Sequence, residues 1–196
     1  MPEEQQRFYG KYRGQVSDNQ DPNNMGRIRA RVPAVFGELD SGWALPCVPY
    51  AGDGIGFYMI PPVGANVWIE FEAGSLSSPV WTGCFWASGQ LPNDPNPDIK
   101  IIKTDTHTIT LDDTSGEEKI EVLHKDGSAI LLDNDGIHVT QSGGANIIID
   151  ASSITVDNNG PKITLEASSI TIDNNGQKIE LGAASVTING SALEVM

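Results

Sequence analysis

Apolar and polar residues alternate in short runs through the first half of the chain, and no window shows the spacing of an amphipathic helix. The clearest run is 27–35, where Ile28, Ala30 and Val32 alternate with three arginines. Together with the Gly and Pro residues between runs, this pattern predicts a loop at 18–26 and five strands, at 8–16, 27–35, 43–50, 65–71 and 79–85. Short strands in this number indicate a small closed or partly closed barrel, for which the oligonucleotide/oligosaccharide-binding (OB) fold is one candidate.

The second half of the chain is a repeat. The segment ITVDNNG at 154–160 returns sixteen residues later as ITIDNNG at 170–176, and in shorter form as VTING at 186–190. Apolar–polar–apolar triplets lie within and between these segments, and their starts are alternately nine and seven residues apart. A period of two within each triplet indicates a strand with one buried face. The predicted inward-facing core residues are Ile154, Val156, Ile163, Leu165, Ile170, Ile172, Ile179, Leu181, Val186 and Ile188.

These triplets are too thin to enclose a core in one chain. Each buries two aliphatic side chains, worth about 1.5–3 kcal/mol apiece when fully buried, whereas ordering the backbone costs about 1–2 kcal/mol per residue. A single chain coiled with three faces would repeat about every 24 residues, but the repeat here is sixteen. Three chains around one axis accept any multiple of eight. We therefore predict an all-β protein, an N-terminal OB-fold barrel followed by an intertwined trimeric (triple-stranded) β-helix.

Composition changes at the same place as the pattern. All thirteen aromatic residues and both cysteines precede residue 87, and the segment 91–98 (LPNDPNPD) is rich in proline. We predict an OB barrel at 1–90, a linker at 91–98 and the β-helix at 99–196. The net charge of −14 argues against nucleic acid as a partner. The chain has no apolar run long enough to span a bilayer and no signal-peptide pattern at its start, so we expect a soluble protein made in the host cytoplasm.

Four segments carry a resemblance to a known family: YGKYRGQV at 9–16, DPNNMGRIRARVP at 21–33, PPVGANVWIEFE at 61–72 and PVWTG at 79–83. They resemble the OB domain of central-spike proteins of contractile phage tails and related injection systems, which include puncturing tail lysozymes and the valine-glycine-repeat proteins of type VI secretion. In this family an octad repeat follows the barrel, as it does here. The segment 91–98 leaves no room for the lysozyme domain that some members carry, so the sequence resembles the enzyme-free spike.

The resemblance implies a homotrimer located in the virion, at the tail baseplate. Its OB domain would sit on the baseplate hub, its β-helix would point at the bacterial outer membrane, and a PAAR-like protein would cap the tip. The predicted function is mechanical piercing of the cell envelope, with no enzymatic activity; phage, tailocin and secretion-system origins stay open. One alternative is a glycan-binding or depolymerising tailspike on a β-helix stalk, although residues 99–196 contain no aromatic residue to stack on a sugar. An OB module for single-stranded nucleic acid is a further alternative, which the negative charge disfavours.

The residues with catalytic chemistry do not form a catalytic pattern. Paired carboxylates occur at 112–113 and 117–118, in predicted turns where solvated charge is the simpler interpretation than the two acids of a glycosidase. Cys47 and Cys84 lie in predicted apolar strands and are expected as buried free thiols. A nucleophilic role is not expected, because the first domain contains no histidine to act as a base. No catalytic residue and no cofactor are predicted.

Metal binding rests on three histidines, His107, His124 and His138. Some spikes of the resembled family hold iron at the tip through His-x-His pairs, and this chain has none. Strand parity places His138 outward, whereas His107 shares the parity of Ile109 and is the one candidate for an ion on the trimer axis. Asp157, Asp173 and Asn189 recur with the repeat; they would serve as turn residues or, alternatively, as oxygen ligands for Ca²⁺.

Two groups of residues in the first half are candidates for assembly and packing. Arg27, Arg29 and Arg31 share one strand face and are expected to contact the hub or a neighbouring subunit, with a solvated face as the alternative. The second group is expected to pack in the core or between subunits, with base or sugar stacking as the alternative; it comprises Trp68, Trp81, Phe85 and Trp86.

Overall fold

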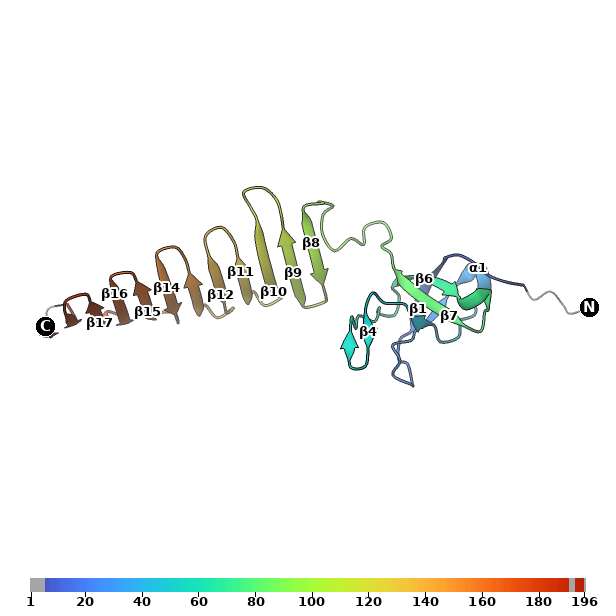
Figure 1. Ribbon diagram of the computed structural model, residues 1–196, viewed down its shortest axis with the longest axis horizontal. Helices are drawn as coiled ribbons and strands as arrows, with labels where there is room; N and C mark the ends of the chain where they lie inside the picture. Colours follow the sequence, from blue (N-terminus) through green and yellow to red (C-terminus); the bar gives the residue numbers. More distant parts are fainter. Residues whose placement is uncertain (1–5, 191–192, 196) are drawn as a thin grey trace, which may run out of the picture. The chain divides into compact units, whose positions relative to one another are not determined.

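The computed structural model describes residues 6–190 and 193–195, and the chain divides into two compact units, Met1–Leu91 and Pro92–Met196 (Figure 1). Both units are built from β-strands, and the predicted all-β class is confirmed. In the described residues no helix is long and apolar enough to cross a membrane.

The first unit is a five-stranded sheet in the order β2-β1-β6-β7-β3. Its pairs are antiparallel except β3 with β7, which is parallel. A separate hairpin, one helical turn and one 3₁₀ turn join these strands. The bounds are β1 (Tyr12–Asp18), β2 (Arg29–Arg31), α1 (Pro33–Phe36), β3 (Leu45–Pro46), β4 (Ala51–Gly52), β5 (Ile55–Gly56), β6 (Asn66–Phe71), η1 (Glu72–Gly74) and β7 (Pro79–Cys84).

The core of this unit comes from the alternation seen in the sequence. Ile28, Ala30 and Val32 are fully buried, as their pattern predicted, and the arginines between them point outward. The rings of Phe8, Tyr12 and Phe36 each pack edge-on against the ring of Phe71. The other buried apolar residues are Val16, Ala44, Val67, Ile69, Phe71 and Trp81.

Three strand predictions had wrong bounds. The run 8–16 is a strand only from Tyr12, and that strand continues to Asp18. The other two runs were too long, and proline is the reason in both. The run 27–35 is a strand only over Arg29–Arg31, because Pro33 starts α1, where its fixed backbone angle and missing N–H are tolerated. The run 43–50 is reduced to Leu45–Pro46, since Pro46 and Pro49 cannot donate to a ladder. The hairpin of β4 and β5 was not predicted.

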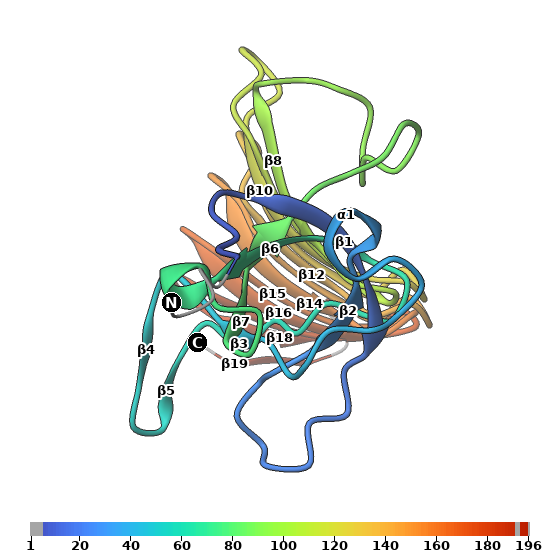
Figure 2. The same ribbon diagram turned by 90° about the vertical axis from the view of Figure 1, so that its right-hand side faces the viewer.

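The second unit is one twelve-stranded antiparallel sheet in which every strand pairs with the strands before and after it in the sequence (Figure 1). Viewed from one end, the strand direction turns gradually along the sheet (Figure 2). The strands are β8 (Ile99–Lys103), β9 (His107–Asp112), β10 (Lys119–His124), β11 (Ala129–Leu132), β12 (Ile137–Thr140), β13 (Asn146–Ile149), β14 (Ser153–Asp157), β15 (Pro161–Glu166), β16 (Ser169–Asn174), β17 (Gln177–Gly182), β18 (Val186–Ile188) and β19 (Leu193–Val195).

In this sheet the short aliphatic triplets lie side by side on strands of one chain. The chain does not coil to close a core; it forms an open sheet whose hydrogen-bond ladder is complete between successive strands. The intertwined trimeric β-helix is a property of three chains together, so it stays a prediction. The turns between strands lie along the two lateral edges of the sheet. Because the strands are antiparallel, successive turns alternate between the two edges.

Candidate assembly interface

The strand register aligns the aliphatic residues of the second unit into two unbroken columns on one face, which we call the aliphatic face. The first column is Ile109, Val122, Ile130, Val139, Ile147, Val156, Ile163, Ile172, Ile179, Ile188 and Leu193. The second is Leu111, Ile120, Leu132, Ile137, Ile149, Ile154, Leu165, Ile170, Leu181 and Val186. All ten predicted core residues lie in these columns.

In the single chain this face has no cover. Every member of the two columns is between 36% and 53% exposed. A contiguous aliphatic surface of this length on a chain with net charge −14 is typical of an interface with another protein surface. The opposite face carries a mainly polar central column: Thr110, Glu121, Leu131, His138, Ile148, Thr155, Thr164, Thr171, Glu180 and Thr187.

The two lateral edges of the sheet differ in chemistry. One edge, which we call the acidic edge, holds the turns 113–118, 133–136, 150–152, 167–168 and 183–185. The other, which we call the histidine edge, holds the described turns 104–106, 125–128, 141–145, 158–160, 175–176 and 189–190, and His107 and His124 stand beside its first two turns. A covering surface would therefore meet different groups at each edge.

The comparisons with known proteins match both units. Residues 12–86 match the type VI secretion system/phage-baseplate injector OB domain. Residues 99–160 and 157–194 match the phage baseplate V C-terminal trimerisation domain. The chain belongs to the phage baseplate V family of spike proteins. The predicted OB barrel and the resemblance to central spikes are thereby confirmed, and the aliphatic face lies in the domain that the family uses to trimerise.

One similar protein is much longer than this chain. The actin cross-linking toxin VgrG1 of Vibrio cholerae serotype O1 is 27% identical over 123 residues. The alignment covers 56% of this chain and 11% of the toxin, so the spike spans about a tenth of that relative's length. The shared segment supports membership of the spike family.

The three predicted assembly arginines of the spike have intramolecular partners. The Arg27 guanidinium donates to both carboxylate oxygens of Asp21, with N–O distances of 2.6–3.1 Å. The guanidinium of Arg29 lies 5.2 Å from the centroid of the Trp43 ring, and Arg31 is 3.9 Å from Asp40. Arg27 is therefore committed within the OB domain, while Arg29 and Arg31 are exposed on β2 and available for contacts with another protein.

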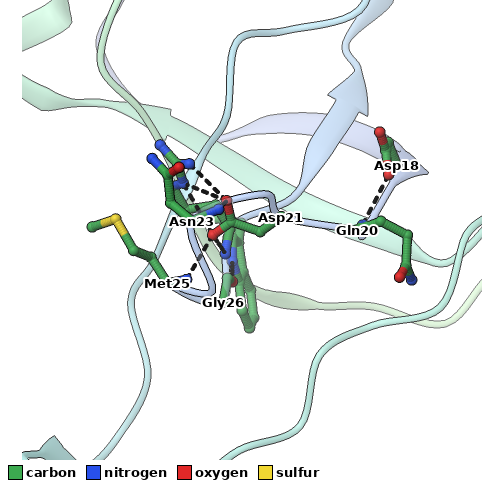
Figure 3. A network of polar contacts seen from close by, with 8 residues as sticks. Asp18, Gln20, Asp21, Asn23, Met25 and Gly26 are labelled. Atoms are coloured by element: carbon green, nitrogen blue, oxygen red, sulfur yellow. Dashed lines mark hydrogen bonds and ion pairs between the residues drawn. The ribbon is translucent and has the colours of Figure 1, made fainter.

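The Asp21–Arg27 pair organises the loop before β2 (Figure 3). Besides Arg27, the Asp21 carboxylate accepts hydrogen bonds from the backbone N–H groups of Asn23 (3.0 Å) and Met25 (2.7 Å). The next turn of this loop is fixed by Trp81, whose indole N–H donates to the carbonyl of Gly26 at 3.2 Å. The side chains of Asp21 and Arg27 are only 5% and 17% exposed, so water does not replace this network easily.

We expect Asp21→Asn to lower the thermal midpoint of the OB domain by several degrees. The asparagine keeps the shape but removes the charge that Arg27 and the loop N–H groups bind. The Arg27 guanidinium holds the pKa of Asp21 far below its usual range, so the pair's stabilisation is present above the ordinary carboxyl pKa of about 4 and is lost only as the pH falls through the lower folded value. Calorimetry at pH 7 measures the loss in Asp21→Asn, and a series from pH 4 downward measures the acid loss in the parent.

A matched control for this pair is Asp40→Asn. Asp40 is exposed and 3.9 Å from Arg31, an arrangement that contributes little. The control should leave the midpoint within about one degree of the parent. Equal losses in the two variants would contradict a special role for the Asp21 network.

The cysteine prediction was wrong in one respect. Cys47 and Cys84 are free, as expected, but both are exposed rather than buried. Cys84 is the last residue of β7, opposite Val67 of β6, and Cys47 follows the two-residue strand β3, so each lies at the end of a strand.

The aromatic candidates divide between core and surface. Trp81 is 4% exposed and lies in the core, whereas Trp86 is 64% exposed. The rings of Trp68 and Phe85 lie 4.7 Å apart, and the Arg13 guanidinium is about 6 Å from each ring centroid, at 5.9 and 5.8 Å. The Trp68 and Phe85 rings therefore already have Arg13 of the same chain as their neighbour.

The paired carboxylates make turn contacts. Asp112 accepts from the backbone N–H of Thr114 at 3.0 Å, Asp113 pairs with Lys100, and Glu118 accepts from the N–H of Gly116 at 3.0 Å. The recurring acids behave likewise: Asp157 accepts from the Asn159 N–H, and Asp173 from the Gly176 N–H, both at 2.8 Å. Asn189 accepts from the Lys178 N–H at 2.7 Å. The structure thus uses all three repeat residues as hydrogen-bond acceptors at turns.

The histidines fall on opposite faces. His138 is on the polar face, as strand parity predicted, with its Nε2 3.5 Å from Asp133. His107 shares the aliphatic face, but it stands in the column at the histidine edge, outside the two aliphatic columns that would surround an axis. Its neighbour there is His124, which the sequence analysis did not connect with it.

Proposed function

We propose that the protein is the non-enzymatic central spike of a contractile-tail baseplate, a homotrimer that pierces the bacterial outer membrane. The observation that carries this proposal is the pair of unbroken aliphatic columns, which one chain leaves about 40% exposed along its whole described sheet. The match to a trimerisation domain supports two further copies of the chain as the cover.

Burial of this face is sufficient to drive assembly. Covering the exposed part of each aliphatic side chain contributes roughly 1 kcal/mol, at about 25 cal/mol per Å². About twenty such residues per chain therefore yield tens of kcal/mol per trimer, against an association cost of about 4–15 kcal/mol for each chain added. Charged residues do not interrupt either column, so no buried ion opposes the packing.

Threefold symmetry gives the assembly a definite form. Three sheets become the faces of a prism, with the aliphatic faces inward and the polar faces in solvent. Because rotation carries each sheet onto the next, the histidine edge of one subunit meets the acidic edge of its neighbour. The twist of each sheet winds the three chains around the axis, which is the form that the predicted intertwined helix would take.

Such a prism is suited to mechanical work. Twelve strands at a spacing of about 4.8 Å make a rod about 53 Å long. Its hydrogen bonds run along the rod and its side chains fill the axis, so bending would break both ladder and packing. The OB domain would seat the rod on the baseplate hub through exposed residues such as Arg29 and Arg31, and a PAAR-like protein would cap the other end.

The oligomeric state tests this proposal directly. Light scattering of the purified chain should give a mass three times the 21.0 kDa of one chain, and the trimer should persist in SDS without heating. A stable monomer at micromolar concentration would contradict the spike. Release of reducing ends from envelope polysaccharides would contradict the non-enzymatic assignment and favour the depolymerase alternative.

A further inference from the structure

His107 and His124 are directly opposite each other at the ends of β9 and β10. Their ring centroids are 4.8 Å apart and their planes are inclined by 52°, so the rings are not stacked. An imidazole nitrogen bound to zinc at about 2.1 Å places its ring centroid about 3.2 Å from the ion, so this spacing corresponds to an angle of about 100° at a shared ion. Both rings line an open groove of about 580 Å³ on the aliphatic face.

The second nitrogen of each ring already has an oxygen partner. Nδ1 of His107 is 2.7 Å from the Thr106 hydroxyl, and Nδ1 of His124 is 2.9 Å from the Asp126 carboxylate. The backbone N–H of Ser128 donates to the Asp126 carboxylate at 2.7 Å and so helps to hold it in place. A hydroxyl at Nδ1 of His107 and a carboxylate at Nδ1 of His124 are the kind of outer partner that orients metal-binding histidines toward binding through Nε2.

A third ligand is missing from the single chain. In the described residues no group of three His, Cys, Asp or Glu side chains is placed to hold an ion. The other end of the same strands carries acids: Glu118 immediately precedes β10 and shares the parity of the aliphatic face, while Asp113 is occupied by Lys100. The Glu118 carboxylate accepts hydrogen bonds at Oε2 from the N–H of Gly116 at 3.0 Å and from the Asn134 side chain at 3.2 Å.

We propose that His107 and His124 bind a divalent transition-metal ion such as Zn²⁺, with Glu118 of the partner subunit as the third protein ligand. The third ligand rests on the proposed trimer, in which the histidine edge of one subunit meets the acidic edge of the next at the level of β10. Two imidazoles and one carboxylate are a ligand set that zinc accepts, with water in the fourth position. Three ions per trimer would link the three pairs of neighbouring subunits at the level of β9 and β10.

The test uses untagged full-length protein, stripped with a chelator and titrated with Zn²⁺ against a chromogenic competitor. We expect one ion per chain. The double variant H107Q/H124Q should weaken binding at least 100-fold, and E118Q about tenfold, with the trimer mass unchanged. His138→Gln is the matched control, because His138 also lies beside a carboxylate but on the polar face, and it should bind like the parent.

The possible outcomes separate this inference from the proposed function. A trimer that binds no Zn²⁺ below millimolar concentration, or H107Q/H124Q that binds like the parent, would overturn the site. If E118Q has no effect, the seam ligand is wrong. If the chain is a monomer yet binds one ion through the two histidines, the histidine pair stands and the trimer fails.

Discussion

Ile163→Asp is expected to abolish the trimer and leave a 21.0 kDa chain or a non-specific aggregate. Ile163 lies midway along the first aliphatic column, with Val156 and Ile172 as its register neighbours. In a threefold prism the substitution places three carboxylates at one level around a dry axis. Each costs several kcal/mol to bury without a partner, and each repels the other two. Light scattering and sedimentation measure the loss.

The matched control is Thr164→Asp, one residue further along β15. Its side chain lies on the polar face, opposite Thr155 and Thr171, and would stay in solvent. The charge added to the chain is the same, so a net-charge effect would appear in both variants. A trimer that survives Ile163→Asp would show that the aliphatic face is not the assembly surface.

Gly136→Ala should cause the largest loss of stability among the turn positions. Gly136 has φ +148°, and a Cβ built on it would lie 2.1 Å from the carbonyl oxygen of Ile149 in β13. That contact is with backbone, which cannot move without breaking the pairing of β12 with β13. We expect the free energy of unfolding to fall by at least about 3 kcal/mol per chain, measured by denaturant titration.

Gly176→Ala separates the clash from the backbone conformation. Gly176 also has a positive φ, of +92°, in a turn of the same sheet, but a Cβ there would meet no atom within 4 Å. Its cost should be limited to the conformational term, about 1 kcal/mol. If the two variants lose the same stability, the close approach at Gly136 does not constrain the sheet.

In the OB domain, sequence reasoning succeeded where burial is one-sided and failed where proline or a strand end intervened. The alternation around Ile28 identified a core strand because fully buried and exposed residues leave a period of two. The same alternation overran Pro33, and the apolar runs at 43–50 and 79–85 wrongly placed Cys47 and Cys84 in the interior. Apolar character in the sequence continues to the end of a strand, where the side chain can be exposed even though its backbone is paired, as at Cys84 opposite Val67.

The histidine pair marks the limit of pattern reading at the candidate metal site. Parity placed His107 on the aliphatic face but could not say which residue stands beside it. That neighbour depends on the turn 113–118, whose length sets the register of β10 against β9 and so brings His124 opposite His107. A loop of six residues has no diagnostic turn signal, and a shift of one residue would have turned His124 to the other face.

The sequence by itself determined that the second half is a stack of short strands with one aliphatic face, because a period of two and a repeat of eight are local properties of the chain. Only the tertiary structure decided that successive strands pair within one chain as an open antiparallel sheet, with two unbroken columns and two chemically different edges. Hydrogen-bond partners and register depend on how each turn closes, and the free energies of alternative closures differ too little to be read from side-chain patterns.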